Sequence, residues 1–466
     1  MLYNCTWVIH MILARENISK YKIQDYLGRG FLCNCGREHS VDIEKVVIEN
    51  GAIAKIPEIL IFFNFKKIFM VADENTYNVA GAGIEKILRN GDFELYKLVY
   101  IREGNLVPDE KAMGEFIINL PETTDVILAV GSGVISDLCK FMSYKLKIPY
   151  IMVATAPSMD GYASTAAPLT INGLKTTLSA TVPKAIIGDI DILKNAPMDM
   201  IRAGFGDVIG KYSAINDWKL GRLINDEYYC EFVSDMVMYS VKKCVETADR
   251  LQKRDDSAIR NLMECLLLTG IAMSYTGNSR PASGSEHHLS HFIEMVYMFD
   301  GKESPPHGIK VGFNTIAVNY IREKISELNP DFSEVTKKAS EFDKNKWLED
   351  VKRLFRVSAA EVIDLNEREG INSYDKRMKR VKRIIDRWNE IVEILAEVPS
   401  YNEIRDILRK IGAPVTLKEL GVDRETVLNG LVYAKEIRNR YTVLQLAWDL
   451  GVLGDLAEEM GQKFYV

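Results

Sequence analysis

Short apolar runs alternate with helix-like patterns along the chain up to about residue 190. Four runs rich in Val, Ile and aromatic residues predict buried strands at residues 66–73, 93–101, 125–131 and 149–155. Apolar positions at helical spacing lie between the last two runs, in GSGVISDLCKFMSYKLK. Because a strand, a turn, a helix and a second strand follow in this order, the pattern predicts a parallel sheet.

The pattern changes at about Pro197, where strand-like runs fade and long charged amphipathic segments begin. Two examples are residues 234–254 and 374–398. This spacing predicts an almost wholly helical second half. A chain of 466 residues also exceeds one typical hydrophobic core, so we expect two domains. We predict an α/β nucleotide-binding domain with a parallel sheet over residues 1–194 and an all-α domain over residues 195–466.

Composition narrows the classes of partner. The formal net charge of −6 offers no general attraction for nucleic acid or anionic lipid. The Lys/Arg-rich run at 376–387 is followed closely by acidic residues, which is typical of a solvated helix face. No segment approaches the roughly 18 apolar residues of a membrane span. We therefore expect neither a nucleic-acid partner nor an integral membrane segment.

Cysteine usage and the N-terminal sequence indicate the compartment. Seven irregularly spaced cysteines suggest no disulfide framework, which favours a reducing cytoplasm. The apolar run WVIHMILA, residues 7–14, lacks a basic lead-in and a small-residue cleavage site. This run predicts an N-terminal helix or strand, and a cytoplasmic protein.

Two features at predicted strand ends suit a nucleotide. Gly131, Ser132 and Gly133 end one strand and open a helix, whose free N–H groups and positive dipole end suit a phosphate. Position 136 is Ser, so the G-x-G-x-x-G fingerprint is incomplete and a plain tight turn is the alternative. Asp73 closes an earlier strand, where it could accept hydrogen bonds from an adenosine ribose or simply cap a helix. Together these features favour a dinucleotide.

The stretch ATAPSMDGYAS, residues 154–164, directly follows another predicted strand. Its small residues, proline and hydroxyls let a ligand approach the backbone closely. Asp160 lies within it, and a structural Asx turn is the alternative reading of that residue.

Three of the six histidines, His287, His288 and His291, lie within five residues, and His307 follows. His287 and His291 are four residues apart and share one helix face, and His288 and His291, three apart, do so too. Two imidazoles and a carboxylate would leave open positions on a divalent transition metal. The alternative is a surface patch of histidines.

The carboxylate candidates for such a metal are Glu286 and Asp207, and Asp207 could instead cap the helix that follows it. A second cluster, Cys33, Cys35 and His39, lacks a fourth ligand and the usual spacing of a zinc knuckle. We interpret this second cluster as structural or incidental.

Six stretches closely resemble the sn-glycerol-1-phosphate dehydrogenase family, which is related to glycerol dehydrogenase, iron-containing alcohol dehydrogenase and dehydroquinate synthase. They are VGSGVISDLCKF, VATAPSMDGYAS, PKAIIGDIDIL, AGFGDVIGKY, SRPASGSEHHLSH and PPHGIKVG. The likeness runs from about residue 30 to 330 and continues more loosely to APVTLKELGV and IRNRYTVL. It implies a dehydroquinate synthase-like fold, with NAD(P) and one divalent metal ion (Zn, Ni or Fe) between the two domains.

The resemblance also implies roles for individual residues. Asp207, His287 and His307 match the metal ligands, and Asp160, Asp207 and His291 match catalytic and substrate-contacting positions. The adjacent His288 leaves the choice of ligand open, although the HxxxH spacing of relatives favours His287. The cofactor-binding stretches of the family match Asp73, Gly131, Ser132, Gly133, Val134, Ile135, Ser136, Asp137, Thr155, Ala156, Pro157, Ser158 and Ser164.

The implied reaction is reversible hydride transfer between NAD(P)H and dihydroxyacetone phosphate, giving sn-glycerol 1-phosphate for (ether) glycerophospholipid synthesis. Asp73 favours NAD over NADP, because a carboxylate repels the 2′-phosphate of NADP. A glycerol dehydrogenase-like enzyme, a dehydroquinate synthase-like cyclase and a protein with a decayed site are the alternatives.

The substrate phosphate needs a cation. Arg280 is favoured because it precedes the histidine-bearing segment and offers two donors, and a salt bridge that anchors its loop is the alternative. Lys211 and Lys175 are further candidates, whereas Lys219 lies on a predicted exposed helix face. The apolar surface of the helical half predicts a homodimer.

Overall fold

The computed structural model describes residues 13–28, 30–171 and 174–464. The element predicted at residues 7–14 lies largely outside these ranges. Contacts divide the chain into two compact units. The first unit holds the described residues up to Ala196 together with Cys230–Lys243 and Asp256–Asn278, and the second holds Pro197–Tyr229, Cys244–Asp255 and the chain from Ser279. Two helical segments beyond the predicted boundary at 194/195 thus pack with the first unit. The sequence did not predict this, because an amphipathic pattern does not reveal which partner covers the apolar face.

A six-stranded parallel sheet with the order β3-β10-β7-β6-β4-β5 is the centre of the first unit. Its strands are β3 (Lys45–Glu49), β4 (Lys67–Asp73), β5 (Glu94–Tyr100), β6 (Val126–Gly131), β7 (Tyr150–Ala154) and β10 (Ala185–Asp189). The four predicted strands are therefore confirmed as β4 to β7, and so is the α/β fold class, but β5 was wrongly predicted to be buried, because it lies at the edge of the sheet and is only partly buried. Every residue of β6 and β7 is buried, as expected for strands covered on both faces.

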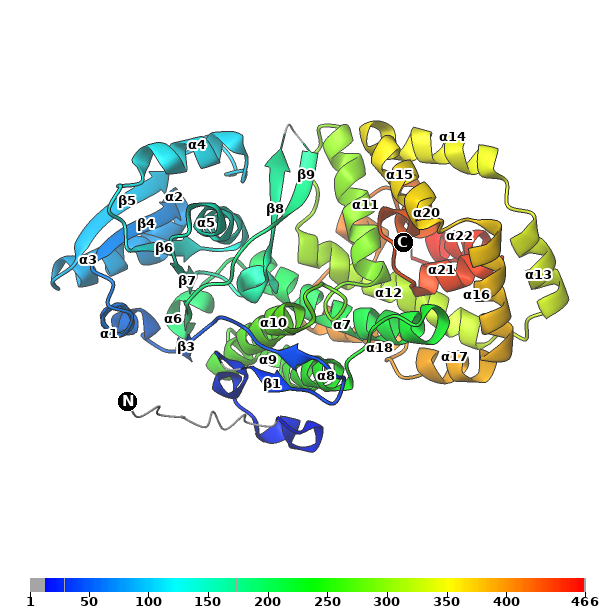
Figure 1. The fold of residues 1–466 in the computed structure, drawn as a ribbon, viewed down its shortest axis with the longest axis horizontal. Helices are drawn as coiled ribbons and strands as arrows, with labels where there is room; N and C mark the ends of the chain where they lie inside the picture. The colour runs from blue at the N-terminus through cyan, green and yellow to red at the C-terminus, as the bar shows by residue number, and fades with distance from the viewer. Residues whose placement is uncertain (1–12, 29, 172–173, 465–466) are drawn as a thin grey trace, which may run out of the picture. The chain divides into compact units, whose positions relative to one another are not determined.

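The first unit also holds helices and two hairpins. The hairpins are β1 (Phe31–Leu32) with β2 (Glu38–His39) and β8 (Ala166–Ile171) with β9 (Leu174–Ser179). The helices are η1 (Arg15–Lys20), η2 (Ile23–Tyr26), η3 (Ala52–Lys55), α1 (Ile56–Phe62), α2 (Glu74–Thr76), η4 (Tyr77–Gly81), α3 (Ala82–Arg89), α4 (Glu110–Asn119), α5 (Gly133–Leu146), η5 (Gly161–Ala163), α6 (Ile190–Leu193), α8 (Glu231–Val245) and α10 (Asp256–Thr276). Helix α5 confirms the predicted βαβ unit and packs on β6 (Figure 1).

The described part of the second unit is helical, which confirms the predicted change of pattern. Its elements are α7 (Met198–Asn225), α9 (Ala248–Leu251), α11 (Ser285–Phe299), α12 (His307–Ser326), α13 (Phe332–Ser340), α14 (Lys344–Phe355), η6 (Arg356–Ser358), α15 (Ala359–Glu369), α16 (Tyr374–Asp386), α17 (Trp388–Leu395), α18 (Tyr401–Lys410), α19 (Leu417–Leu420), α20 (Arg424–Tyr433), η7 (Ala434–Ile437), α21 (Val443–Asp449) and α22 (Leu453–Lys463). Among the residues that the structure describes, no helix combines the length and apolar character needed to cross a bilayer.

The Lys/Arg-rich run at 376–387 is not wholly a solvated face. Arg377 and Arg380 of α16 are buried, and Arg380 forms a double hydrogen bond to Asp449 of α21 at 2.8 and 2.9 Å. The partner carboxylate is far away in the sequence, so the expectation of full solvation was wrong for these two arginines.

Helices α7 and α12 cross in direct backbone contact. A Cβ added to Gly206 of α7 would overlap the carbonyl oxygen of Gly308 in α12, and one added to Gly308 would overlap the carbonyl oxygen of Ala203. The crossing therefore requires glycine at both positions. It also brings the neighbouring residues, Asp207 and His307, to the same place.

Replacing Gly206 with alanine is expected to lower the free energy of unfolding by about 3 kcal/mol, because the new methyl group meets backbone that cannot rotate away. Urea denaturation monitored by circular dichroism measures this loss. Gly454→Ala is the matched control, since a Cβ at that position in α22 meets open space. Equal stability of the two variants would contradict the close crossing.

Candidate functional site

The predicted phosphate turn joins β6 to the 14-residue helix α5. A Cβ on Gly131 would lie 2.6 Å from Cβ of Ile135, so glycine is required where the strand meets the helix. Ser132 occupies the N-cap without a side-chain cap bond, and the buried hydroxyl of Ser136 has no hydrogen-bond partner among the described residues. The turn thus presents the N-terminus of α5 at the carboxyl edge of the sheet, with Gly133, Val134, Ile135 and Asp137 in its first turns.

The second predicted cofactor stretch lies beside this turn. The backbone N–H of Thr155 donates to the carbonyl of Gly131 at 2.9 Å. Lys140 of α5, fully buried, donates to the carbonyls of Gly161 at 2.8 Å and Ala166 at 3.2 Å. The structure therefore holds residues 131–137 and 155–164 together in the first unit.

Within that stretch, internal bonds fix the loop. The hydroxyl of Tyr162 donates to the carbonyl of Ala156 at 2.7 Å, and that of Ser164 donates to Gly161 at 3.0 Å. Pro157 and Ser158 lie between β7 and η5, and Asp160 precedes η5. Gly270 of α10 lets that helix approach closely, because a Cβ there would lie 2.7 Å from the carbonyl oxygen of Asp160.

Asp73 ends β4, next to β6 in the sheet. Its carboxylate accepts a hydrogen bond from the N–H of Thr76 at 2.8 Å and so caps α2. Asp73 thus caps a helix, which was one of its two predicted roles. It lies at the same edge of the sheet as the Gly131 turn.

In the second unit, Asp207 of α7, His287 of α11 and His307 of α12 come together. One potential ligand atom from each lies within 4.8 Å of the others. Nε2 of His287 is 3.3 Å from Oδ1 of Asp207, and the rings of His287 and His307 are 5.2 Å apart between centroids. Three residues from distant parts of the sequence, which the resemblance matches to metal ligands, thus lie close together.

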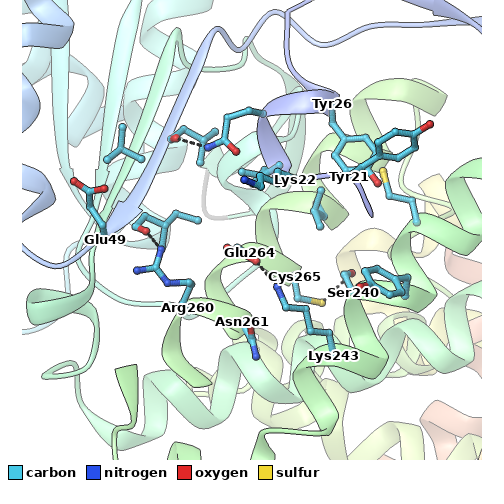
Figure 2. A pocket seen from close by; sticks show the side chains of 18 of the residues that line it. Tyr21, Lys22, Tyr26, Glu49, Ser240, Lys243, Arg260, Asn261, Glu264 and Cys265 are labelled. Atoms are coloured by element: carbon cyan, nitrogen blue, oxygen red, sulfur yellow. Dashed lines mark hydrogen bonds and ion pairs between the residues drawn. The ribbon is translucent and has the colours of Figure 1, made fainter. Parts of the chain in front are cut away.

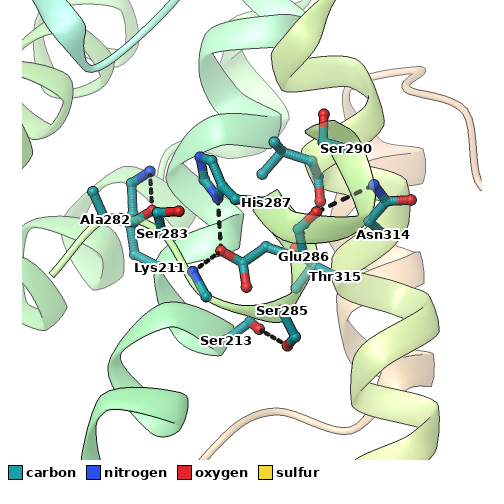
Figure 3. A network of polar contacts seen from close by, with 12 residues as sticks. Lys211, Ser213, Ala282, Ser283, Ser285, Glu286, His287, Ser290, Asn314 and Thr315 are labelled. Carbon is teal, nitrogen blue, oxygen red and sulfur yellow. Dashed lines mark hydrogen bonds and ion pairs between the residues drawn. The ribbon is translucent and has the colours of Figure 1, made fainter. Parts of the chain in front are cut away.

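Each of the two imidazoles is held by a glutamate. Nδ1 of His287 lies 2.7 Å from Glu286 Oε1 (Figure 3), and Nδ1 of His307 lies 2.7 Å from Glu294 Oε1. Because an ionised carboxylate only accepts, both Nδ1 atoms donate and both Nε2 atoms are left for a ligand. This carboxylate–imidazole arrangement is the one that orients histidines on a metal. Glu286, the other candidate carboxylate, therefore supports His287 from behind.

The charges around Asp207 favour its ionised carboxylate, which is the form that binds a metal ion. Burial alone would raise the pKa of Asp207, but the ammonium of Lys211, with the rings of His287 and His307, holds it well below its usual range. Lys211 is fully buried and donates to Asp207 at 2.9 Å and to the carbonyl of Ala282 at 3.1 Å. Its ammonium is thus engaged within the centre.

Buried contacts also fix the first turn of α11. Asp217 of α7 accepts hydrogen bonds from the N–H and the hydroxyl of Ser285, both at 2.7 Å, and pairs with Arg322 of α12 at 2.6 Å. A Cβ on Gly284 would lie 2.7 Å from this same carboxylate. The helix that carries His287 is therefore anchored to both α7 and α12.

Comparison with known proteins adds a second line of observation. The chain is 33% identical to "Glycerol-1-phosphate dehydrogenase [NAD(P)+]" of Geobacillus stearothermophilus, over 88% of this chain and 94% of that one. The chain belongs to the glycerol-1-phosphate dehydrogenase family. A relative with the same name from Pyrococcus furiosus is 28% identical over 86% of this chain and 92% of its own. The profile of the iron-containing alcohol dehydrogenases matches residues 47–197.

Solved structures agree on the fold. Glycerol dehydrogenase from Schizosaccharomyces pombe superposes with a TM-score of 0.58 at 16% identity, over 90% of this chain and 91% of that one. Maleylacetate reductase from Rhizobium sp. superposes with a TM-score of 0.56 at 13% identity, over 92% and 97% of the two chains. At these identities the likeness concerns the fold alone.

In this member of the glycerol-1-phosphate dehydrogenase family, His288 differs sharply from His287. His288 is fully buried, and neither ring nitrogen has a hydrogen-bond partner among the described residues. Burial and the charges of Arg438 and Arg440 hold the pKa of His288 well below its usual value. Of the two adjacent histidines, only His287 joins the group with Asp207 and His307.

Glu294 is a residue that the sequence reasoning missed. It lies 3.3 Å from Nδ1 of His291 and 2.7 Å from Nδ1 of His307, and so links these two rings. Burial lowers the pKa of His291, and Glu294 opposes that shift. The signal was present in the sequence, because His291 and Glu294 are three residues apart on one helix face.

The predicted phosphate cations have other contacts. Arg280 is buried against Glu227, with Nε at 2.7 Å, which is the salt bridge named as its alternative. Lys219 pairs with Glu397. The side chain of Lys175 lies outside the described residues.

Arg438 and Arg440 were missed. Both donate to the hydroxyl of Ser279, at 3.3 and 3.0 Å, and Arg440 also donates to the carbonyl of Ser283 at 3.3 Å. Burial, with the charges of Arg438 and Arg280, lowers the pKa of Arg440 to about 9. They lie in the stretch IRNRYTVL, whose spacing alone did not predict a phosphate-binding site.

A cavity of about 520 Å³ lies elsewhere in the first unit (Figure 2). Tyr26, Glu49, Lys243 and Arg260 are among its lining residues, and none of the sequence-predicted site residues is. It therefore adds nothing to the site described above.

Proposed function

We propose that this chain catalyses the reversible reduction of dihydroxyacetone phosphate by NAD(P)H to sn-glycerol 1-phosphate, in a metal-dependent manner. The observation that carries the proposal is the centre formed by buried Asp207 and His287 with partly exposed His307, in which a glutamate contacts each imidazole. The glycerol-1-phosphate dehydrogenase of Geobacillus stearothermophilus, 33% identical over most of both chains, supports the choice of substrate.

NAD(P) is assigned to the turn at 131–137 and the loop at 155–158, with Ser164 near the nicotinamide and Asp73 near the adenosine ribose. The N-terminus of α5 supplies a positive dipole end for the pyrophosphate. Gly131 lets this helix start directly at the strand, so the backbone is close to the ligand.

The donor set fits a divalent cation. One carboxylate and two imidazole nitrogens suit zinc, nickel or iron(II). Such an ion, when bound, supplies Lewis-acid polarisation of the substrate carbonyl. The proposed ligands are already oriented and charged for such an ion, because Glu286 and Glu294 fix the orientation of the two rings and Lys211 keeps Asp207 ionised.

His291 is assigned to the substrate, together with Asp207 of the same unit. Glu294 holds Nδ1 of His291, so Nε2 remains to bind a hydroxyl of the glycerol moiety and to accept or return its proton. Unchanged turnover and an unchanged pH profile in His291→Ala would remove this role.

The phosphate is assigned to Arg438 and Arg440, in place of Arg280. Neither forms a salt bridge within the described ranges, whereas Arg280 has Glu227. Two half-buried guanidinium groups with depressed pKa values repel each other, and a phosphate dianion relieves that repulsion. Arg438 also acts electrostatically on His291.

The proposal is tested by dialysing the purified protein against a chelator and restoring zinc, nickel or iron(II) one at a time. Oxidation of NADH and NADPH is then followed with dihydroxyacetone phosphate and, separately, with dihydroxyacetone. We expect turnover of the phosphorylated ketone only after a metal is restored. No turnover with any metal would overturn the proposal, and preference for dihydroxyacetone would favour a glycerol dehydrogenase. The homodimer and the cytoplasmic location stay predictions of the sequence.

A further inference from the structure

A second group of metal-type donors lies in the first unit. Cys33, Cys35 and His39 belong to the hairpin of β1 and β2, and Cys230 immediately precedes α8. One donor atom from each of the four residues lies within 4.8 Å of all the others. The sequence showed only three of them, because Cys230 is 191 residues away from His39.

The distances match tetrahedral coordination. The sulfurs of Cys33 and Cys230 are 3.6 Å apart, and Nε2 of His39 lies 3.3 Å from Sγ of Cys35 and 3.4 Å from Sγ of Cys230. With zinc–sulfur bonds of about 2.3 Å and zinc–nitrogen bonds of about 2.0 Å, a tetrahedron has sulfur–sulfur edges of about 3.8 Å and sulfur–nitrogen edges of about 3.5 Å. A disulfide requires a sulfur–sulfur distance of about 2.05 Å, so Cys33 and Cys230 are not joined by one.

The imidazole is oriented for this task. His39 is fully buried, and its Nδ1 lies 2.9 Å from the carbonyl oxygen of Tyr275, to which it donates. Its ring stacks on that of Tyr275 with centroids 5.4 Å apart, and the edge of Phe31 packs beside it. The carbonyl thus fixes the tautomer and turns Nε2 toward the sulfurs, as backbone carbonyls do for metal-bound histidines.

Backbone N–H groups also contact two of the sulfurs, although burial raises the pKa of both thiols, Cys33 and Cys230. The backbone N–H of Cys35 bonds to Cys33, and that of Val233 bonds to Cys230. Cys230 stands at the N-terminus of the 15-residue helix α8, where the dipole stabilises negative charge. Gly36, at φ 83°, closes the turn that brings Cys33 and Cys35 to the same side of the hairpin.

We propose that Cys33, Cys35, His39 and Cys230 bind one structural Zn²⁺ ion. Three sulfurs and one imidazole are a zinc donor set, and four protein ligands leave no open position for a substrate. The ion ties the hairpin of residues 31–39 to the start of α8, two segments that are far apart in the sequence.

The first test is the zinc content of protein purified and kept under reducing conditions. His287→Ala removes a ligand of the centre proposed for catalysis, so we expect one equivalent of zinc to remain. The double variant His287→Ala/Cys230→Ser is expected to lose that equivalent, whereas His287→Ala/Cys265→Ser keeps it. Cys265 is a matched control, because it is a buried cysteine of the same unit outside the cluster.

The second test uses cobalt(II) as the probe on wild-type protein. Sulfur-to-cobalt charge-transfer bands in the near ultraviolet, with intense visible bands of tetrahedral cobalt, are expected. The Asp207 centre holds no sulfur and cannot produce the charge-transfer bands, so this signature does not depend on the proposed enzymatic function. Cys35→Ser, which alters the least buried cysteine of the cluster, should weaken the bands and lower Tm by about 10 °C.

Three results would overturn the proposal. They are folded wild-type protein that binds cobalt without the charge-transfer bands, a zinc content that Cys230→Ser leaves unchanged, and a Cys33–Cys230 disulfide that persists in protein purified under reducing conditions. Circular dichroism of every variant identifies a variant that fails to fold, and the wild-type spectrum then decides the question.

Discussion

Replacing His287 with alanine is expected to lower kcat/KM for dihydroxyacetone phosphate about 10³-fold, with loss of the bound catalytic metal. The variant deletes one of the three proposed metal ligands and its contact with Asp207, whereas the ion pair of Asp207 with Lys211 remains. Loss of the electrophile removes several kcal/mol of transition-state stabilisation, or about 4 kcal/mol for this change in rate. Steady-state kinetics after addition of saturating metal, together with metal analysis of the same samples, measures both effects.

His288→Gln is the control for this variant, since it alters the adjacent buried histidine and leaves the ligand set intact. We expect it to keep its metal, even where the packing of α11 is disturbed. If His288→Gln lost the metal and His287→Ala retained it, the assignment of the ligand would pass from His287 to His288.

The double variant Arg438→Gln/Arg440→Gln is expected to lower kcat/KM for dihydroxyacetone phosphate about 10³-fold. Each guanidinium contributes about 1.5–3 kcal/mol through hydrogen bonds to a charged oxygen, which for two groups agrees with this loss. The unphosphorylated ketone has no such contact, so its kcat/KM should change by less than about 3-fold. The ratio of the two substrates is therefore the quantity to measure.

Two further variants separate recognition from folding. Arg387→Gln alters an exposed arginine that pairs with Glu390 on the surface, and it should leave the substrate ratio unchanged. Arg280→Gln breaks the buried pair with Glu227 and is expected to lower stability. A collapse of the ratio in Arg280→Gln, with no change in the double variant, would return the phosphate to Arg280.

Local patterns predicted much of the fold. The apolar runs predicted four of the six strands, and three of these, β4, β6 and β7, are continuously apolar because they are buried on both faces. Strand β3 was missed because KVVIE is only half buried and short, and β10 because a glycine and an acid interrupt it. The assignment of α8 and α10 to the first unit depends on tertiary contacts, which no periodicity records.

The residues of the candidate site could likewise be predicted only where their spacing in the sequence is local. Residues close together in the sequence, such as His287 and His291, could be placed on one helix by spacing alone. Partners that come from distant segments could not, and these include Cys230 for the thiol cluster and Arg440 for the proposed phosphate site. Glu294 lies between these cases, because its spacing from His291 is local but its contact with His307 is not.

The crossing of α7 and α12 limits how closely the backbones that carry Asp207 and His307 can approach each other. Gly206 and Gly308 already place the two backbones in van der Waals contact, so the helices cannot move closer together. A cation too small to span the gap cannot draw its ligands inward and must complete its shell with solvent, whereas a larger one can push the side chains apart by rotamer changes. Preference among ions of equal charge should therefore follow ionic radius as well as donor chemistry.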